Sequence, residues 1–424
     1  MYHPPQKGNA LVLALVTIYF LLPKINIIGI ETSSSGIRAD DFIAVAILML
    51  TLKAVVNKNL LKIAKPYLTY IAFGFVTAII LLITEFSSFR GFLYSFRQIE
   101  YAIFLLAGFY LHKKGVGINN SLMLILIYQT TLAILQQQGL IRSFTSAYGA
   151  VENLGRSVGA TGGPWELAPL ITLLAATLAK NCITTGREKK AIAIYLVGFV
   201  AILTTGSRIG MLGFLFSTII FIDNFSPKKI LTIGALVSVF FIAFSLGSAT
   251  YEDRSSKGLN ITENIGTAID IYNRSQPSIS TYAKETLRGS EMTGESDLSW
   301  IFRFSKWAVA IKIYIQNPGL WLTGLGPGLF GNALDGGVIR ILFENGIIGF
   351  ILFFRFFLGA AKKSRLALVL VSTLLINMIF IDLYISSKFI PLLLFILAYH
   401  WNEKPLRKNI DQKSGNYSVA AQTH

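Results

Sequence analysis

Two short segments of this sequence place an arginine beside glycines at the edge of an apolar run, a combination that suits a phosphate ligand. Residues 156–166 read RSVGATGGPWE, and the glycines of this turn allow close approach to the backbone. Residues 204–210 read TTGSRIG and put Arg208 between two apolar runs, where a charge is costly and marks a functional candidate. Arginine fits phosphate oxygens with two parallel hydrogen bonds. Arg156 and Arg208 are therefore candidate ligand-binding residues. The alternatives are a plain helix cap at Arg156 and snorkelling to the interface at Arg208.

A third segment combines an amphipathic pattern with a further arginine. Residues 297–316 predict a helix that lies along a membrane interface, with Arg303 off its apolar face. That predicted face consists of Trp300, Phe304, Trp307, Ile311 and Ile315. Asn317-Pro318 ends the helix. The GLGPG sequence at 324–328 lacks the preceding strand and the spacing of a dinucleotide fingerprint, so we interpret it as a tight turn near a ligand.

Carboxylates are the candidate bases in these segments. Glu166 would lie at the positive end of the helix that follows the glycine turn, and Asp335 precedes another apolar helix. Arg340 and Glu344 are four residues apart and can pair, either as a buried structural pair or as part of a binding site.

The sequence contains only four histidines, His3, His112, His400 and His424, and one cysteine, Cys182. All four histidines fall on the side that we predict to be cytoplasmic, so a metal site is not expected on the opposite side.

Apolar segments make up most of the 424 residues and must position these groups. Hydrophobic residues are 53% of the chain and charged residues 14%, which is far below the charge content of soluble domains. Runs of about 20 apolar residues can cross a bilayer as helices. We therefore predict an all-α polytopic membrane protein. Its twelve expected transmembrane helices span residues 10–30, 42–56, 67–83, 95–111, 122–140, 165–179, 191–205, 209–222, 230–247, 337–359, 366–383 and 387–401. The first of these contains Pro23 and is expected to kink or to end early.

The lysines set the predicted orientation, because cytoplasmic loops are enriched in basic residues. With twelve helices, one side holds most of the lysines together with both termini. These one-sided basic residues are Lys58, Lys62, Lys65, Lys113, Lys114, Arg187, Lys189, Lys190, Lys228, Lys229, Lys362, Lys363 and Arg365. The basic residues of these loops also account for the net charge of +16, so this charge does not indicate that the protein binds nucleic acid. The first apolar run is not followed by a cleavage site and is expected to remain as a membrane helix.

The opposite side is expected to carry arginines instead. They are Arg38, Arg90, Arg97, Arg142, Arg156, Arg208, Arg254, Arg274, Arg288, Arg303 and Arg340. A polyanionic ligand would explain the set as a whole, although single arginines could pair with lipid headgroups or local carboxylates. We expect four regions: helices 1–9 at 1–246, a large periplasmic loop at 247–336, helices 10–12 at 337–401, and a disordered cytoplasmic tail at 402–424.

The order of these motifs resembles a known family. Arg156 and its glycine-proline turn come first, followed by TGSR, which ends at Arg208. A long outer loop comes next, and it contains Arg303 and Trp307 before the Asn-Pro pair. The GLGPG sequence, an acidic residue and ENGIIG from Glu344 then follow in this order. RADD at 38–41, which opens the second helix, fits as well. This pattern is similar to the O-antigen polymerase and ligase superfamily of bacterial membrane glycosyltransferases, over about residues 10–400. Each motif is loose, and their order carries the likeness.

The resemblance implies an enzyme of the inner membrane that needs no metal or cofactor. Such enzymes take glycan from undecaprenyl diphosphate on the periplasmic face. Polymerases transfer it to a new lipid-linked repeat unit, and ligases transfer it to lipid A–core. Expected partners are the lipid-linked glycan donor and acceptor, membrane lipids, a chain-length regulator and a flippase. Ligases typically carry a histidine near 333–336, where this chain has Asp335, so the resemblance favours a polymerase.

The resemblance also implies roles for the candidate residues. Arg208 and Arg303 would bind the diphosphate, with Arg156 and Arg340 assisting and Glu344 beside Arg340, and Asp335 or Glu166 would be the base. A lipid-linked oligosaccharide transporter is the main alternative, although the two halves of the sequence show no repeat. A channel and a non-catalytic envelope protein are further alternatives.

Overall fold

The computed structural model describes residues 7–30, 32–55, 58–83, 89–144, 156–221, 298–330 and 334–401, with a few isolated positions between 231 and 274. Within these ranges the regular secondary structure is helical except for one two-stranded hairpin, which confirms the predicted helical class. The predicted helix 230–247, the polar stretch 247–297 and the tail 402–424 lie almost entirely outside the described residues.

The N-terminal helix is shorter than predicted. Helix α1 (Lys7–Leu21) ends just before Pro23, as its lack of an N–H favours. The following residues form a hairpin of β1 (Asn26–Ile30) and β2 (Thr32–Arg38), which pair antiparallel with Gly29 opposite Gly36. The first apolar run predicted a helix that includes 26–30, and this was wrong, whereas its expected early end near Pro23 is confirmed. Residues 33–36 are serines and a glycine of low helix propensity, and they lie in strand β2.

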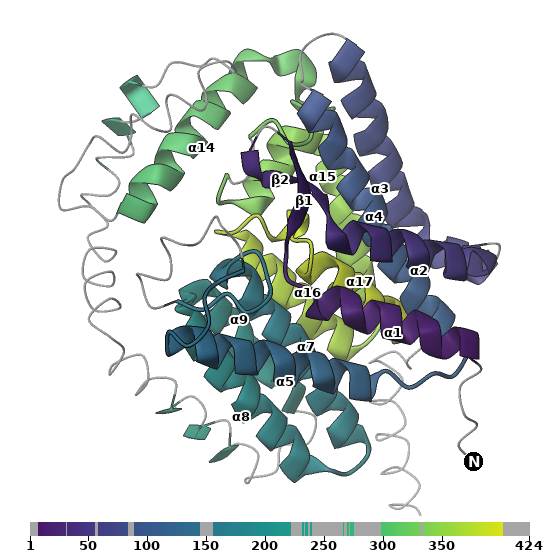
Figure 1. Ribbon diagram of the computed structural model, residues 1–424. Coiled ribbons are helices and arrows are strands. Elements are labelled where there is room, and N and C mark those ends of the chain that lie inside the picture. Colours follow the sequence, from purple (N-terminus) through teal and green to yellow (C-terminus); the bar gives the residue numbers. More distant parts are fainter. Residues whose placement is uncertain are drawn as a thin grey trace, which may run out of the picture.

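Three long helices stand side by side in the structure (Figure 1). They are α3 (Lys58–Ile83), α4 (Phe89–Lys113) and α15 (Gly337–Ala361), and α2 (Ala39–Val55) packs against α4. Aromatic side chains join α3 to α15: the Tyr67 and Phe356 ring centroids are 5.0 Å apart, and those of Tyr70 and Phe353 are 5.4 Å apart. Such pairs add to the packing energy of an apolar interface.

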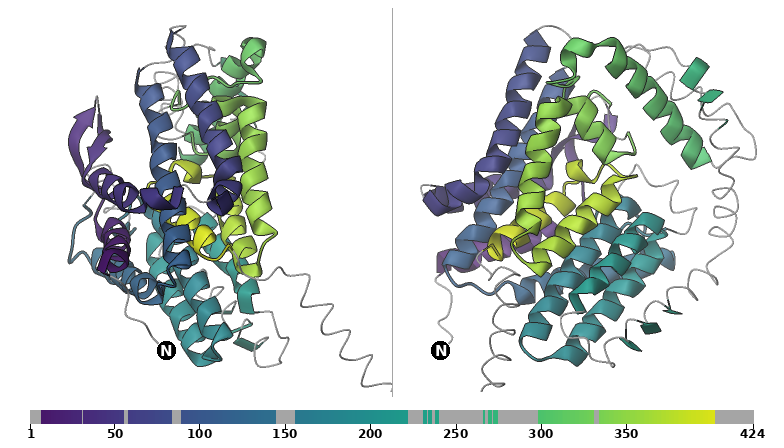
Figure 2. Two further views of the ribbon diagram at one scale, coloured as in Figure 1. Left: turned by 90° about the vertical axis from the view of Figure 1, so that its right-hand side faces the viewer. Right: turned by 180° about the vertical axis from the view of Figure 1, so that it is seen from behind.

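A second group of helices surrounds α7 (Pro164–Thr184), whose first sixteen residues are buried except for Trp165. Its neighbours are α5 (Asn119–Gln137), α8 (Glu188–Thr205), α9 (Arg208–Ser217) and α16 (Arg365–Met378), and η2 (Thr218–Phe221) continues α9. Figure 2 shows this group below the three long helices. A helix that is apolar on all sides is a central element of such a bundle.

Helix α14 (Leu298–Gln316) lies apart from both groups, at the upper left of Figure 1. It ends before Asn317-Pro318 as predicted, and η4 (Pro318–Leu320) follows. Val309, Ala310 and Ile313 are buried in a small separate core with Phe343. Of the predicted apolar face, Trp307 and Ile311 pack against this core, whereas Ile315 is 53% exposed. The side chains of Trp300 and Phe304 lie outside the described residues.

The last helix pair is interrupted by a buried irregular segment. The sequence predicted helices at 366–383 and 387–401. Helix α16 instead ends at Met378, and α17 (Phe389–Tyr399) begins eleven residues later, after the short turn η5 (Leu383–Ile385). Residues 382–388, hereafter the 382–388 segment, are buried apart from the half-buried Ile385. Helix α15 is also broken, because Gly346 has φ 63° and ψ −175°.

Several predicted basic loops lie at one end of the bundle. The Tyr399 hydroxyl donates to the Val116 carbonyl at 2.9 Å, and Asn181 donates to Asn119 at 2.6 Å. These contacts join the C-terminal ends of α17 and α7 to the turn that follows α4. The Lys363 ammonium lies 5.6 Å from the centroid of the Trp401 ring. Hence the C-terminal ends of α4, α7, α15 and α17, with the lysines near them, lie at the same end of the bundle.

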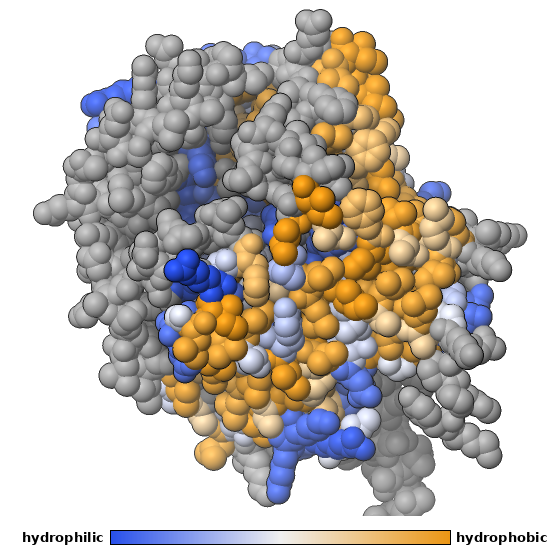
Figure 3. All heavy atoms as spheres, viewed as in Figure 1, coloured by the Kyte–Doolittle hydropathy of each residue, from blue (hydrophilic) through white to orange (hydrophobic). Residues whose placement is uncertain are grey.

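Apolar side chains also cover much of the outside. Phe42 and Met49 on α2 and Ile80 on α3 are each more than half exposed. Figure 3 shows a largely hydrophobic described surface on the right of this face, with hydrophilic side chains gathered at its lower end. Among the described residues, three helical stretches are long and apolar enough to cross a membrane: Ala64–Ile83, Pro164–Thr184 and Gly337–Ala361. Four shorter apolar helices accompany them. The number of crossings stays a prediction.

Candidate functional site

Two glutamines on α5 hold the glycine turn that contains Arg156. Gln136 Oε1 accepts hydrogen bonds from the amides of Val158 and Gly159, at 3.0 and 2.7 Å. Gln129 Oε1 accepts one from Ala160 at 2.9 Å. The two glutamines are seven residues apart, so they project from one face of α5. They satisfy backbone donors that a buried turn would otherwise leave unpaired. No pattern in the sequence had marked these two glutamines as part of the site.

The structure brings the Arg156 and Arg208 segments together. Arg156 Nε donates to the Thr205 carbonyl at 2.9 Å, and the Ser157 amide donates to the Thr204 carbonyl at 2.9 Å. Both acceptors belong to the last turn of α8, where carbonyls have no partner within the helix. Two segments that the sequence named separately are therefore one structural unit.

The turn between α8 and α9 puts Arg208 at the start of a helix. Gly206 ends α8 with φ 59°, a left-handed conformation that glycine adopts readily. Ser207 caps α9 and accepts from the Gly210 amide at 3.2 Å. A cation at this position is unfavourable for the helix dipole. The first turn of a helix and an arginine together attract an anion, so this unit is suited to bind phosphate.

Glu166 is buried and has hydrogen-bond donors on both carboxylate oxygens. It is 1% exposed. Its Oε2 accepts from the Gly162 amide at 2.6 Å, and its Oε1 accepts from the Lys388 amide at 2.8 Å and from the Ser386 hydroxyl. These bonds fix the glycine turn against the 382–388 segment. A carboxylate held in this way has little freedom to take a proton from a substrate.

Asp382 connects the same segment to the turn before α15. Its oxygens accept from the amides of Leu334, Asp335 and Gly336 at 2.5, 3.2 and 3.0 Å. They also accept from Arg340 Nη1 at 2.9 Å. One carboxylate thereby satisfies three buried or partly buried amides of the turn that leads into α15.

Arg340 and Glu344 form the predicted ion pair. Arg340 is fully buried, and its Nε donates to Glu344 at 2.9 Å. Glu344 also accepts from the Tyr384 hydroxyl at 2.6 Å. Because Asp382 pairs with Arg340 as well, the guanidinium faces two carboxylates in the protein interior. Its assistance in ligand binding stays a prediction, and a ligand would need an opening to reach it.

Asp335 is the more accessible of the two predicted bases. Its side chain is 35% exposed and pairs with Lys306 of α14 at 2.9 Å. Its φ is 60°, the one positive φ of a non-glycine residue in the described ranges. Trp307 donates to the Leu334 carbonyl at 3.0 Å and so docks α14 on this turn. A strained backbone held by several contacts is typical of functional positions.

Arg303 lies one helical turn before Lys306 on α14. Its side chain is half-buried, and its Nε atom has no hydrogen-bond partner within the described part of the chain. A buried guanidinium nitrogen without a partner is costly. This feature is compatible with the predicted binding of an anion by Arg303.

A second group of buried charges lies on the other side of the 382–388 segment. Lys388 pairs with Asp40 at 2.8 Å, and Asp40 contacts Arg38 at 3.1 Å. Arg38 and Arg97 then share Glu100, at 3.2 and 2.8 Å. Burial alone would raise the pKa of Asp40, but Lys388 and Arg38 outweigh it and lower that pKa. Asp41 pairs with both Arg38 and Arg97, so three cations meet three carboxylates, and the group stabilises the contact between the N- and C-terminal helices.

The sequence contained a signal for part of this group. RADD at 38–41 was noted as a family-like motif, whereas Lys388, a lone lysine before an apolar run, was not singled out.

Among the described residues, no group of three histidine, cysteine or carboxylate side chains is arranged to hold a metal ion. No known family model matches the chain, and no curated protein matches it.

Proposed function

We propose that this protein is a membrane glycosyltransferase that polymerises undecaprenyl-diphosphate-linked oligosaccharide repeat units. The observation that carries the proposal is the unit formed by Arg156 and Arg208, two arginines on adjoining turns at the ends of apolar helices. Two guanidinium groups near a helix N-terminus suit a diphosphate next to a membrane.

The proposed topology has twelve membrane-spanning helices in the bacterial inner membrane, with both termini in the cytoplasm. The region 247–336 would then be periplasmic. Support comes from the ends of α4, α7, α15 and α17, which meet at one end of the bundle together with their lysines. The Arg156 turn leads into the N-terminus of α7 and the Arg208 turn follows the C-terminus of α8, so both turns lie at the opposite end of these two helices from the loop that joins them.

In the proposed reaction, a hydroxyl of the acceptor sugar attacks the anomeric carbon of the donor, and the bond from that carbon to the diphosphate breaks. Arg156, Arg208 and Arg303 would stabilise the charge that develops on the diphosphate, without a metal. Asp335 would take the hydroxyl proton. We favour it over Glu166 because its side chain is 35% exposed, whereas both oxygens of Glu166 have donors within the protein.

The product would be O-antigen, capsule or another exopolysaccharide. A flippase would supply the lipid-linked units and a chain-length regulator would limit the product, as the resemblance implies. A ligase that transfers glycan to lipid A–core is the nearest alternative, and Asp335 in place of a histidine disfavours it.

A transporter of lipid-linked oligosaccharide is the second candidate. The break in α15 at Gly346 and the irregular 382–388 segment favour it, because interrupted helices at a buried site are typical of transporters. The absence of an internal sequence repeat argues against it.

The test is the surface polysaccharide of cells that lack this gene, complemented with the wild type, Arg208→Ala or Arg187→Ala. Arg187→Ala is the matched control, because Arg187 is an exposed arginine at the other end of α8. We expect wild type and Arg187→Ala to restore a ladder of chain lengths. Arg208→Ala should lower polymerisation by about 10²–10³-fold while the protein remains in the membrane.

The deletion strain separates the candidates. A polymerase predicts loss of the ladder with single repeat units still attached. Complete loss of attached glycan, with long chains on the lipid carrier, indicates a ligase. Absence of repeat units from the periplasmic face indicates a transporter, and an unchanged profile rejects all three.

A further inference from the structure

Lys24 lies beside the glycine turn, at the Gly162 end and not at the Arg156 end. A Cβ on Gly162 would be 3.2 Å from Lys24 Cδ and 3.3 Å from Lys24 Nζ. The lysine side chain therefore crosses the turn where glycine leaves space for it. Gln129 fixes this arrangement, because it holds the turn and its Nε2 also donates to the Phe20 carbonyl at the end of α1, at 3.0 Å.

The ammonium of Lys24 differs from the other cations nearby in its lack of a partner. Within the described part of the chain it makes no hydrogen bond and no ion pair, and its side chain is half-buried. Arg38, Arg97 and Lys388 each pair with at least one carboxylate. Partial burial of an ammonium without a partner is costly, and an anionic ligand would remove this cost.

Glu166 is the carboxylate that acts most strongly on Lys24, yet the two form no ion pair. Its oxygens instead accept hydrogen bonds from two backbone amides and a serine hydroxyl. The strongest charges around Lys24 are two carboxylates, Glu166 and Asp40, and two guanidinium groups, those of Arg38 and Arg97. Because these four charges balance, the positive charge of Lys24 is left without compensation.

The chain that follows Lys24 presents apolar side chains to the outside. Ile25 is 48% exposed and Ile27 is 59% exposed. A lysine next to exposed apolar side chains is typical of the boundary between lipid and water, where the ammonium reaches toward anionic headgroups. A ligand that reaches this position from a bilayer has an apolar chain and a phosphate at its head.

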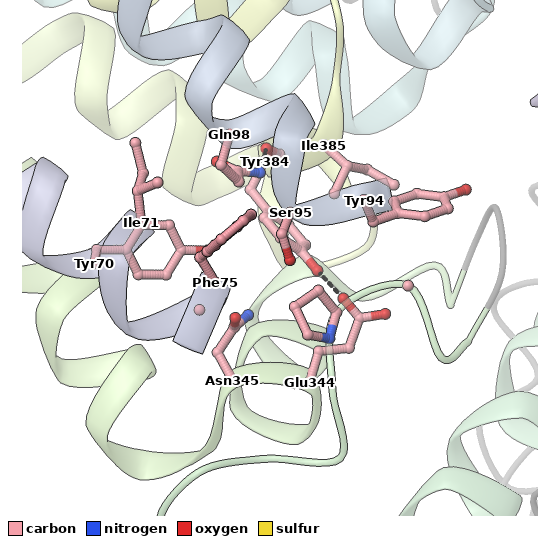
Figure 4. A pocket seen from close by; sticks show the side chains of 13 residues that line it. Tyr70, Ile71, Phe75, Tyr94, Ser95, Gln98, Glu344, Asn345, Tyr384 and Ile385 are labelled. Atoms are coloured by element: carbon pink, nitrogen blue, oxygen red, sulfur yellow. Dashed lines mark hydrogen bonds between the residues drawn. The ribbon is translucent and has the colours of Figure 1, made fainter. Parts of the chain in front are cut away.

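A pocket between α3, α4 and α15, beside the Arg340–Glu344 pair, does not suit such a ligand. The space that water can enter there is about 20 Å³, which is room for a single water molecule. None of its thirteen lining residues is basic, and Figure 4 shows its Glu344 side chain hydrogen-bonded to Tyr384. The pocket fits an ordered water beside the Ser95 hydroxyl, which has no partner among the described residues.

We propose that Lys24, at the Gly162 end of the glycine turn, binds the phosphate of a membrane-embedded lipid, at a site separate from that of Arg156 and Arg208. Neither arginine is among the charges that act most strongly on Lys24. In the proposed polymerase this ligand is the lipid-linked acceptor, because the reaction joins two lipid-linked units. That assignment rests on the proposed function, whereas the binding itself can be measured without any transfer.

The experiment is a calorimetric titration of the purified full-length protein, in phosphatidylcholine nanodiscs, with farnesyl diphosphate as the probe and empty nanodiscs as the blank. We expect two equivalents to bind to the wild type, one to Lys24→Gln and one to Arg208→Ala. Loss of one hydrogen bond to a charged group weakens binding at its site by about 10–100-fold. Lys24→Arg keeps the charge and should bind two equivalents.

Lys189→Gln is the matched control, because Lys189 is an exposed lysine in the first turn of α8. It should bind two equivalents. The melting temperature of Lys24→Gln should equal that of the wild type, since Lys24 makes no bond within the described residues. A lower melting temperature together with two bound equivalents would mean that Lys24 only balances the charge of Glu166, and would overturn the proposal.

Two further titrations of Arg208→Ala, in which the Lys24 site is expected to remain, identify the source of the phosphate. Inorganic pyrophosphate should bind more weakly than farnesyl diphosphate, because it has no chain to pack on apolar surface. Equal affinities would exclude a lipid as the ligand. Nanodiscs that contain phosphatidylglycerol should leave the bound equivalent unchanged. Its loss would show that a phospholipid headgroup occupies the site, and would overturn the assignment to a lipid-linked substrate.

The two proposals can fail separately. A single equivalent that is lost in Lys24→Gln and kept in Arg208→Ala would confirm the Lys24 site and reject the diphosphate site of the proposed polymerase. A protein that polymerises normally but binds a single equivalent, unaffected by Lys24→Gln, would do the reverse.

Discussion

Two carboxylates that look equivalent in the sequence have different surroundings at the residue scale. Glu166 is 1% exposed and accepts three hydrogen bonds that join the glycine turn to the 382–388 segment. Asp335 is partly exposed and pairs with a flexible lysine, Lys306. A base must reach its substrate, whereas a buried carboxylate with paired oxygens mainly stabilises the fold.

The first prediction separates these roles with isosteric amides. Asp335→Asn should abolish polymerisation while the melting temperature changes little, because the carboxylate loses its basicity at a partly exposed position. Glu166→Gln should lower the melting temperature, since its amide nitrogen would face the amides of Gly162 or Lys388. Activity is measured from the polysaccharide ladder and stability by thermal unfolding in detergent. A full ladder from Asp335→Asn would exclude Asp335 as the base.

At the scale of elements, the glycine turn depends on α5. Three of its amides are satisfied by glutamine side chains and not by the turn itself, and the Gly159 carbonyl accepts from Gln136 as well. The turn then holds Arg156 against the end of α8. The positions of Arg156 and Arg208 should therefore depend on how α5 packs against the glycine turn.

The second prediction tests this dependence. Gln136→Ala removes the acceptor for two buried amides and should destabilise the protein by about 2–6 kcal/mol, at roughly 1–3 kcal/mol for each unsatisfied group. Polymerisation should fall although no arginine is altered. Gln137→Ala is the control, because Gln137 is the next residue of α5 and its side chain is exposed. Equal melting temperatures for the two variants would contradict the role that we assign to Gln136.

At the scale of the whole molecule, the 382–388 segment joins distant parts of the chain. Tyr19 donates to the Ser387 carbonyl at 2.8 Å, Lys388 pairs with Asp40, and Asp382 holds the start of α15. The N-terminal helices, the central α7 and the last two helices thus meet at one buried point. Irregular backbone at such a depth is tolerated only when protein groups satisfy it.

The third prediction concerns the topology of the whole chain. Cys182 is the single cysteine, so a Cys182→Ser background allows each new cysteine to be labelled alone. In intact spheroplasts an impermeant maleimide should label Arg142→Cys. It should label Arg187→Cys and Lys363→Cys only after permeabilisation, because both belong to the predicted cytoplasmic end. Labelling of all three in intact spheroplasts would contradict the proposed topology.

The sequence by itself determined the helical class, the approximate bounds of most helices and the arginine turns. These features are local: hydropathy, proline and glycine act through neighbouring residues. The hairpin at 26–38 and the end of α16 at Met378 were missed, because short apolar stretches do not distinguish a helix from another buried structure.

Only the tertiary structure decided which charges are buried and with what they pair. Glu166 and Lys388 are 222 residues apart in the chain, and Tyr19 and Ser387 are 368 apart. The glutamines of α5, the role of Asp382 and the pocket beside Glu344 all result from such distant contacts. No local pattern encodes them, because each side chain finds its partner only after the helices have packed.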